Sequence, residues 1–418
     1  MSLHRVLTGA PRSTPATYRE HIAQFGELPR TLDITKELLS SGLTGHGGAA
    51  FPTGKKVELL KNQRHGVQFL VVNAMEGEPA SIKDRVLLST NPHLVIDGAV
   101  ALANTLDADQ VIVCVPRDRP KLAAIVQRAI DERPTRARRD ARIELQTPPG
   151  RYVAGEESAL VHWLNDKETL PQYRPTRPAI LTIGRSATLV DNAETCAHVA
   201  LIARYGAEWF RQVGTTHRPG TTVVTVSGAA KPAVTEVPYG TPIIDIIREC
   251  GVINDPQAFL LAGFGGVWID GAEAHRGFDD DSLRPIKATT GAGIVVALPL
   301  NACGIRETAR IVRWMAGESA RQCGPCAFGL PALADDLELL ASGRRAEQTL
   351  SRLQSRASVI EGRGACRHPD GVVRLVRSAL EVFATDVVRH ANGNPCLHAQ
   401  STVVHVPVTQ REEELEWQ

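Results

Sequence analysis

Two cysteines in the stretch ESARQCGPCAFGL, residues 318–330, have the spacing that redox dithiols, zinc sites and iron–sulfur clusters all use. They are Cys323 and Cys326. A thioredoxin-type dithiol follows a sheet strand, usually after a tryptophan, and opens a helix. Here Gln322 precedes the first cysteine, and the residues upstream have helical periodicity. The sequence therefore disfavours a catalytic dithiol.

Zinc and a cluster differ in the further ligands that they need. Zinc usually takes a second ligand pair, and the nearest candidates form no clean pair: Cys366, His368, Cys396 and His398. A cluster takes thiolates from one segment and another from a distant loop, which Cys323, Cys326 and Cys366 supply. The residues favour a cluster, with three thiolates where four are usual.

A glycine-rich stretch is the second chemical feature. SGLTGHGGAAFPTGKKVELL, residues 41–60, places Gly45, Gly47 and Gly48 shortly before an expected helix. Without side chains, backbone N–H groups can approach a phosphate or a flat ring. Two further stretches, NAMEGEPASIKDR (73–85) and RYVAGEESALVHWL (151–164), add an amide, an aromatic ring and four carboxylates: Asn73, Tyr152, Glu76, Glu78, Glu156 and Glu157. Gathered in one cleft, these groups suit recognition of ribityl or ribose hydroxyls and control of flavin electronics.

The pattern of elements explains how these residues are positioned. Between residues 68 and 148, segments rich in β-branched residues alternate with segments of helical periodicity, which predicts a doubly wound α/β fold. Ligands bind such folds at the carboxyl ends of the strands, so the loops after VVNA and before YVAGEESALVHWL should meet. After Arg218 the sequence predicts a strand, a turn containing Lys-Pro, a second strand and a helix from Thr241, as in a β-grasp module.

The C-terminal part is expected to be helical. Apolar residues recur at helical spacing in 305–318, 330–343 and 371–390, and the CGPC motif lies between the first two segments. The charged tail, residues 409–418, is expected to fray.

Composition excludes several classes of protein. A chain of 418 residues suggests two to four domains. The 47 basic and 46 acidic residues are interspersed, which argues against binding of nucleic acid or an anionic membrane. Neither a transmembrane segment nor a signal peptide is evident, so we expect a cytoplasmic protein. Eight scattered cysteines do not form a disulfide framework, and four of them are interpreted as buried small apolar residues: Cys114, Cys196, Cys250 and Cys303.

The order and spacing of these segments resemble the flavin-bearing NADH-dehydrogenase subunit of respiratory complex I and related subunits of soluble hydrogenases and formate dehydrogenases. The resemblance covers residues 25–390 and rests on GLTGHGGAAFPTGKK, VVNAMEGEPASIKDR, YVAGEESAL, ATLVDNAET, the β-grasp segment, ESARQCGPC and GRGAC. It implies a Rossmann-like FMN domain, a β-grasp domain and a helical bundle with a [4Fe-4S] cluster. Hydride would arrive from NADH, and single electrons would leave through the cluster to a partner protein.

Residue roles follow from the same resemblance. Phe51 and Glu78 correspond to residues that contact the nicotinamide nucleotide, and Glu76 and Glu156 are the predicted catalytic residues. The predicted FMN pocket consists of Gly45, Gly47, Gly48, Lys56, Asn73, Glu76, Tyr152, Gly155, Glu156, Glu157 and Asn192.

The chain departs from the family pattern near the flavin. His46 replaces an Arg, Ala50 a Gly, Met75 an Asp and Asp191 an Asn. Leu59 and Arg177 replace aromatics that clamp NADH. Each stacking contact contributes roughly 0.5–1.5 kcal/mol, so we expect NADH binding to be weakened. Arg174 and Arg177 could compensate by pairing with a phosphate or carboxylate.

The cluster motif also departs from the family pattern. Alignment with Glu-Ser-Cys-Gly-x-Cys-x-x-Cys puts Ala320 at the first cysteine position. Cys396 is the predicted fourth ligand and His368 the second choice. An open iron carrying water, a three-iron cluster and no cluster are the alternatives.

The predicted function is that of an NADH dehydrogenase-like subunit that passes electrons from a pyridine nucleotide through FMN and a [4Fe-4S] cluster to a partner subunit, which could belong to a complex at the periphery of a membrane. The alternatives are a ferredoxin-linked flavoprotein that does not use NADH and a redox-inactive scaffold. The predicted domains are an N-terminal segment (1–24), an FMN domain (25–210), a β-grasp domain (215–300), a helical iron–sulfur domain (303–396) and a tail (397–418).

Overall fold

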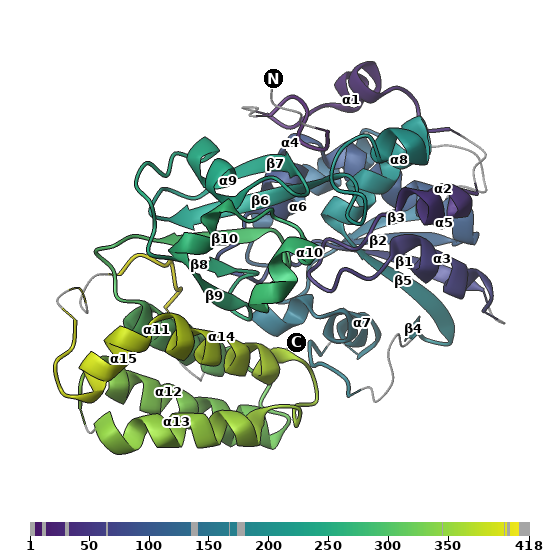
Figure 1. Ribbon diagram of the computed structural model, residues 1–418. Helices are drawn as coiled ribbons and strands as arrows, with labels where there is room; N and C mark the ends of the chain where they lie inside the picture. Colours follow the sequence, from purple (N-terminus) through teal and green to yellow (C-terminus); the bar gives the residue numbers. More distant parts are fainter. Residues whose placement is uncertain are drawn as a thin grey trace.

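Two five-stranded sheets and a helical bundle follow one another along the chain in the computed structural model (Figure 1). The structure describes residues 5–10, 14–29, 33–63, 66–134, 141–166, 168–173, 180–344, 346–396, 398 and 402–408. Arg174, Arg177 and the charged tail 409–418 lie outside the described residues.

The first sheet confirms the α/β pattern predicted from the sequence. Four parallel strands and one antiparallel edge strand have the order β3-β2-β1-β5-β4. The strands are β1 (Val67–Asn73), β2 (Gln110–Cys114), β3 (Arg142–Gln146), β4 (Leu181–Ile183) and β5 (Ser186–Asn192). After β1 the chain builds outward to β2 and β3 and then returns to place β5 on the other side of β1. In doubly wound sheets, ligands bind at the carboxyl ends of the strands where the order reverses, which here are β1 and β5.

Helices cover both faces of this sheet. The apolar sides of α5 (Pro92–Leu106), α6 (Pro120–Asp131) and α8 (Ala193–Phe210) pack on one face, and α7 (Glu157–Asp166) packs on the other. The N-terminal helices of the same region are α1 (Tyr18–Phe25), α2 (Thr35–Ser41), α3 (Thr53–Lys61) and α4 (Lys83–Thr90). Among the described residues no single helix is long and apolar enough to cross a membrane. Helices α4 and α5 reach that length and apolar content only as a pair, and the pair is bent by 96°.

The second sheet has the order β7-β6-β10-β8-β9. Its strands are β6 (Thr221–Gly228), β7 (Ala233–Pro238), β8 (Ala258–Leu261), β9 (Val267–Asp270) and β10 (Ile294–Leu298). The predicted strand, turn, strand and helix after Arg218 are present, but α9 (Ile243–Glu249) begins two residues later than expected, because Pro242 occupies its N-cap position. Short helical turns follow: η2 (Gly271–His275), α10 (Asp280–Leu283) and η3 (Arg284–Ile286).

The helical bundle lies against one face of the second sheet (Figure 1). Successive residues of β10 divide between two cores: Val296 packs with the bundle, and Val295 packs with α9 on the other face. The bundle consists of α11 (Gly304–Gly317), a π-helical turn η4 (Pro325–Gly329), α12 (Leu330–Ala341), α13 (Ala346–Ile360), α14 (His368–Val382) and α15 (Ala384–Ala391).

Two expectations about the bundle need correction. The segment 371–390 forms two helices, α14 and α15, because Phe383 leaves the helical conformation and packs its ring edge-on to Trp268 at 5.3 Å. Helix α13 was not predicted.

The N-terminal residues, which the sequence suggested to be only a polar segment, are held by contacts with distant parts of the chain. The backbone N–H groups of Arg5, Val6 and Leu7 donate to the carboxylate of Glu236 on β7 over 2.7–3.0 Å. The Arg5 guanidinium lies 3.9 Å from the ring centroid of Trp209. These contacts span more than 200 residues of sequence, which is why local patterns did not reveal them.

Candidate functional site

Two asparagines mark the ends of β1 and β5, where a ligand is expected. Asn73 and Asn192 are paired in register at the carboxyl ends of these strands. The Nδ2 of Asn73 donates to the Gly155 carbonyl over 2.9 Å, which joins the loop after β1 to the turn η1 (Tyr152–Gly155). A Cβ on Gly155 would lie 2.6 Å from the Met75 carbonyl oxygen, so only glycine allows this approach. The two loops predicted to meet therefore do meet.

The glycine-rich loop closes over the same strand ends. A bridge between Thr44 and Pro52 forms its base, and the N–H of Gly45 donates to the Phe51 carbonyl over 2.9 Å. The N–H of His46 donates to Thr195 Oγ1 in the first turn of α8 over 2.9 Å. A Cβ placed on Gly47 would lie 3.5 Å from Asn192 Cβ. The bare backbone of this loop is thus held beside the N-terminus of α8, as a phosphate or flat-ring site requires.

Lys56, on α3, is the predicted cation of the site. Its Nζ donates to Glu157 Oε1 over 3.0 Å and to the Val190 carbonyl, and it lies 3.9 Å from Asp191. Burial acts to lower the pKa of Lys56, but the charges of Asp191 and Glu157 outweigh it, so that the pKa is raised. Burial also raises the pKa of Asp191 to about 6, against the opposing charge of Lys56.

Lys83 is a second cation that sequence reasoning missed. Its side chain is 2% exposed, and its Nζ lies 2.8 Å from both Asp84 and Glu194 and 3.3 Å from Asn192 Oδ1. The signal was present, since Lys83 stands inside the NAMEGEPASIKDR motif. The site therefore has one buried ammonium group, on Lys83, and one partly exposed ammonium group, on Lys56, among its carboxylates.

The two predicted catalytic acids cap helices. Glu76 accepts from Ser81 Oγ over 2.6 Å and from the backbone N–H groups of Asp84 and Arg85, at the start of α4. Glu156 accepts from the N–H groups at the start of α7. Both carboxylates thus position loops of the site, a task that sequence reasoning missed, and their catalytic role remains a prediction.

Glu78 spans the junction of the two sheet regions. Its Oε2 accepts from the N–H of Phe264, after β8, over 2.9 Å, and its Oε1 accepts from Ala80 N–H over 3.2 Å. Burial raises the pKa of Glu78 to about 7, although bonds from backbone N–H groups and from Tyr152 act in the opposite direction. Glu78 is therefore a carboxyl group that changes protonation near neutral pH.

Tyr152 connects the strand ends to the helical bundle. Its ring packs edge-on to Trp314 at 5.5 Å and to His368 at 5.4 Å, between centroids. Its backbone N–H donates over 3.1 Å to Glu318, which also pairs with Arg151 at 3.0 Å. Glu318 is the first residue of the stretch that contains CGPC, so this stretch is fastened to the predicted flavin loops.

Three of the four predicted cluster cysteines lie together. Burial raises the pKa of Cys326, and the neighbouring thiols of Cys323 and Cys366 raise it further. Burial raises the pKa of Cys366, the N–H of His368 opposes this, and the nearby carboxylate of Glu156 raises it again. Thiolates gathered in this way repel one another unless a positively charged group joins them, which fits an iron–sulfur cluster.

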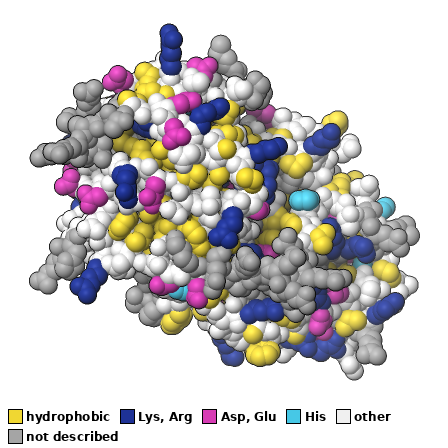
Figure 2. Space-filling model, turned by 180° about the vertical axis from the view of Figure 1, so that it is seen from behind, with side chains coloured by type: hydrophobic (Ala, Val, Ile, Leu, Met, Phe, Trp, Pro, Cys, Tyr) yellow, Lys and Arg dark blue, Asp and Glu magenta, His cyan; other side chains and the backbone are white. Residues whose placement is uncertain are grey.

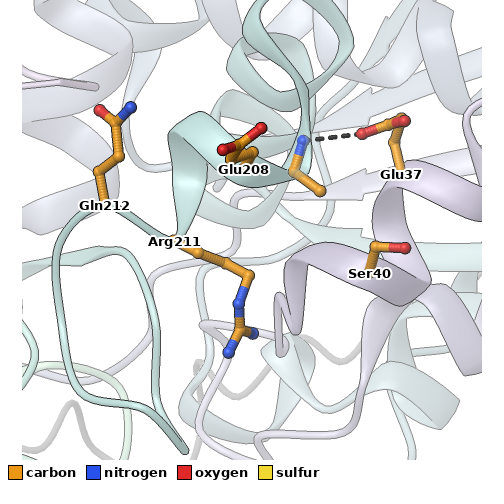
Figure 3. Close-up of a pocket in the computed structure, with 6 residues that line it drawn as sticks. Glu37, Ser40, Glu208, Arg211 and Gln212 are labelled. Carbon is orange, nitrogen blue, oxygen red and sulfur yellow. Dashed lines mark hydrogen bonds between the residues drawn. The ribbon is translucent and has the colours of Figure 1, made fainter.

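A surface pocket of about 580 Å³ lies elsewhere, between α2 and the end of α8 (Figure 3). Its lining includes Glu37, Glu208 and Arg211, and Glu37 accepts from the Ala207 N–H over 2.7 Å beside the kink at Gly206. Glu37 accepts a backbone hydrogen bond there, and none of the predicted site residues lines the pocket. We therefore assign the pocket no part in the chemistry.

Comparison with known proteins supports these two sites. Residues 38–201 match the family model described as the Nuo51 FMN-binding domain, and residues 306–390 match the NADH-ubiquinone oxidoreductase-F iron–sulfur binding region. Together they contain more than half of the 418 residues. The chain belongs to the family of flavin-bearing NADH-dehydrogenase subunits.

Individual members of the family align along most of the chain. An F-type NADH-quinone oxidoreductase subunit of Rhizobium meliloti is 28% identical over 87% of this chain and 90% of its own. The HndC subunit of the NADP-reducing hydrogenase of Solidesulfovibrio fructosivorans is 28% identical over 87% and 76%. A solved structure of the NAD+-reducing [NiFe]-hydrogenase in the H2-reduced state superposes with a TM-score of 0.78 at 28% identity, over 87% of this chain. The chain spans 63% of the length of that hydrogenase chain.

Two residues that replace glycines of the family pattern have a left-handed backbone. Ala50 replaces a glycine of the loop and has a φ of +51°, and Arg321 replaces the glycine of the cluster motif and has a φ of +53°. These left-handed conformations favour glycine. Both positions thus hold a non-glycine residue in a conformation that glycine adopts more easily.

The prediction that Cys396 is the fourth cluster ligand is wrong in this structure. Its ligand atom lies within 4.8 Å of those of Cys303 and His390. Cys303 caps the start of α11, whereas Cys326 contacts Ser319, beyond the other end of that helix. A helix of 14 residues is about 20 Å long at about 1.5 Å per residue, which separates the two groups.

His368, the second choice, is better placed. Its Nε2 lies 2.9 Å from the Met315 carbonyl oxygen, and its Nδ1 is buried without a hydrogen-bond partner among the described residues. Burial lowers the pKa of His368 to about 4, so the ring is neutral at pH 7. With the proton on Nε2, Nδ1 offers a lone pair two residues from Cys366.

The nucleotide side of the site is less complete. Phe51 is half-buried at the glycine loop, and Leu59 is exposed on α3. Met75, where the family has Asp, is buried in the apolar cluster beneath the sheet. Arg177 and Arg174 lie outside the described residues, so the predicted nucleotide clamp is described only in part.

Proposed function

We propose that this protein is an NADH dehydrogenase-like electron-transfer subunit that works in the cytoplasm with a partner subunit. Electrons would pass from a pyridine nucleotide through FMN to an iron–sulfur cluster and then to the partner. The contact of Tyr152 with His368 carries the proposal, because it joins the predicted flavin pocket to the predicted cluster site through adjacent side chains. The names of relatives, which are subunits of NADH-quinone oxidoreductases and of a hydrogenase, support it.

FMN fits the site at the ends of β1 and β5. Gly47 and Gly48 leave room for a ring and phosphate, and Asn73 and Asn192 hold the strand ends that form the floor. Lys56 and Lys83 supply positive charge for phosphate and for electron density on the ring. When bound, FMN accepts a two-electron hydride and releases single electrons. Glu78 and Phe51 would orient the nucleotide, with Glu78 able to hold or release a proton near pH 7.

A [4Fe-4S] cluster fits the end of the bundle beside Tyr152. Cys323, Cys326 and Cys366 would bind three irons, and the Nδ1 of His368 would bind the fourth. The cluster supplies one-electron transfer when bound. The charge of Glu156, which acts on the Cys366 thiol, would then tune the site from the flavin side.

The same proposal gives the three regions their domain names. The first would be a Rossmann-like FMN domain (25–210), the second a β-grasp domain (215–300) and the third an iron–sulfur bundle (303–396), with terminal segments 1–24 and 397–418. The strand orders and the packing of α9 on the second sheet support these assignments. The face in Figure 2 has basic and acidic side chains interspersed, which suits protein and small-molecule partners better than nucleic acid.

A ferredoxin-linked flavoprotein is the second candidate. Leu59, which replaces a clamp aromatic, is 45% exposed and offers no ring for stacking. The two candidates separate when the anaerobically purified full chain is titrated with NADH, NADPH and a reduced ferredoxin while flavin absorbance is followed. We expect bleaching by a pyridine nucleotide. Bleaching by reduced ferredoxin alone would favour the second candidate, and a colourless protein without iron would identify a redox-inactive scaffold.

A further inference from the structure

A second group of metal-binding side chains lies at the far end of α11 from the CGPC motif. Cys303 precedes α11, His390 belongs to the last turn of α15, and Cys396 follows that helix. All three are buried, and their ligand atoms lie within 4.8 Å of one another. Cys303 was interpreted from the sequence as a buried small apolar residue; it is buried, and it also lies beside two other metal-binding side chains. Three segments of chain converge on the group.

The spacing of this group suits a tetrahedral metal ion. Zinc lies about 2.3 Å from sulfur and about 2.0 Å from nitrogen, so two of its ligands are about 3.5–3.8 Å apart. The Sγ of Cys303 and the Nε2 of His390 are 3.6 Å apart. Two thiolates with one imidazole form a donor set that favours zinc over harder cations such as magnesium or calcium.

The surroundings orient His390 as a ligand. Its Nδ1 donates to the carbonyl oxygens of Leu340 and Ala341, at 3.2 and 3.0 Å, in the last turn of α12. With the proton on Nδ1, the Nε2 lone pair points to the two cysteines, as in metal sites where a carbonyl fixes the imidazole tautomer. The Nε2 accepts from the Cys396 N–H over 3.2 Å, a contact that a metal would replace.

The other ligands are also held in place. The Arg306 N–H donates to Cys303 Sγ over 3.4 Å, so the first turn of α11 stabilises a thiolate at this position. Beyond Cys396, the Val403 N–H donates over 2.6 Å to the buried carboxylate of Glu307, and Arg310 donates to the Val404 carbonyl over 3.2 Å. The chain after Cys396 is therefore fastened to the same helix that begins at Cys303.

We propose that Cys303, His390 and Cys396 bind a structural Zn²⁺ that clasps the C-terminal segment to the start of α11. An oxygen ligand would complete the tetrahedron. This site is independent of the cluster site and of the proposed function.

Metal analysis of the anaerobically purified full chain tests this proposal. We expect about one zinc per chain beside the iron, and Cys396→Ser and His390→Gln should lose the zinc while keeping flavin and iron. Cys250→Ser, which alters a half-buried cysteine of the second sheet region, is the matched control and should keep the zinc. Retention of zinc by Cys396→Ser overturns the proposal.

X-ray absorption at the zinc edge needs no variant and is unaffected by flavin or iron. We expect two sulfur neighbours at about 2.3 Å and two nitrogen or oxygen neighbours at about 2.0–2.1 Å. Three or more sulfur neighbours would place the zinc at the CGPC motif and contradict the proposal. So would a zinc-free protein that takes up no added zinc, or a Cys303–Cys396 disulfide found by mass spectrometry.

Discussion

The two ends of α11 carry similar side chains in different settings. At its C-terminal end, Cys323, Cys326 and Cys366 lie beside Tyr152 and the loops of the predicted flavin pocket. At its N-terminal end, Cys303 meets His390 and Cys396 in the core that the helices share with the second sheet. Both ends contain cysteines. Only the C-terminal end lies next to the predicted flavin pocket, from which electrons would come.

The helical bundle can thus hold a redox site at one end of α11 and a structural metal site at the other end. A site that exchanges electrons needs a short path to its donor, and the ring contacts of Tyr152 provide one. A structural metal site needs enclosure and ligands from distant parts of the chain, which Cys303 and Cys396 have. Substitutions at each end of α11 and in the flavin loops should therefore have separable consequences.

The cluster end should respond most strongly to substitution. Cys323→Ser removes one of three thiolates, so the low-temperature EPR signal of the reduced protein should disappear and iron should fall to near zero. Zinc at the other end of α11 should stay unchanged. Cys396→Ser should give the reverse result, with the EPR signal intact. If both variants lose the same metal, the two ends are not independent.

Gly47→Asp should eject FMN from the purified protein. A carboxylate at this position would occupy the approach to ring and phosphate and repel the latter. Gly47→Ala is the control for folding, because a Cβ there makes only an ordinary contact with Asn192. Flavin is measured by its absorbance after denaturation. Full flavin in Gly47→Asp would show that the predicted loop is wrong.

His368→Ala should convert a four-iron into a three-iron signal, or lower the iron content by about one per chain. Ala320→Cys in the same variant should restore the four-iron signal, because it returns a thiolate to the position that the family motif uses. EPR of oxidised and reduced samples follows the change. An unchanged spectrum in His368→Ala would exclude this histidine as the fourth ligand.

Glu78, which lies on the flavin side of the molecule, predicts that the free energy of unfolding depends on pH. Its folded pKa of about 7 lies above the ordinary glutamate pKa of 4.5. The contribution of protonated Glu78 to the free energy of unfolding is therefore fully present below pH 4.5 and is lost as the pH rises through 7. The loss is at most about 3 kcal/mol, from about 1.4 kcal/mol per pKa unit. Urea unfolding of the flavin-free chain at pH 5 and pH 8 measures it. Glu78→Gln should reduce the difference, whereas Glu58→Gln, at an exposed position of α3, should leave it unchanged.

The smallest effect is expected for a substitution in the nucleotide clamp. Leu59→Phe restores a clamp aromatic at an exposed position, and a stacking contact of roughly 0.5–1.5 kcal/mol should lower the NADH concentration needed to bleach the flavin by about twofold to tenfold. Anaerobic titration gives the midpoint. Bleaching of the unmodified protein by a stoichiometric amount of NADH would contradict the view that the clamp is weakened.

Local patterns predicted the fold well where each element shows its own periodicity. The strands β1–β3, β6 and β7 and the helices α11 and α12 were expected from β-branched runs and apolar spacing, and the meeting of the loops at the strand ends followed from strand polarity. The other five strands were not assigned from the sequence. The break at Phe383 could not be predicted locally, because it depends on a contact with Trp268 more than 100 residues away in sequence.

The candidate site was predictable in its residue types but only partly in its geometry. Spacing brought Cys323, Cys326 and Cys366 together correctly, whereas Cys396 was assigned by its position after the last helix, without knowledge of which end of α11 that helix reaches. Lys83 was missed because a lysine followed by Asp84 and Arg85 resembles a surface position. Its burial depends on an ion pair with Glu194 in the first turn of α8, far along the chain.

Electron transfer from flavin to cluster is tested most directly when both groups are followed in one sample. The anaerobic full chain is reduced stepwise with NADH or NADPH while flavin absorbance and low-temperature EPR are recorded. We predict that the flavin bleaches and that a cluster signal appears in the same titration, and that Cys366→Ser abolishes only the EPR signal. Flavin bleaching without any cluster signal, in protein shown to contain iron and to give that signal with dithionite, would contradict transfer from flavin to cluster.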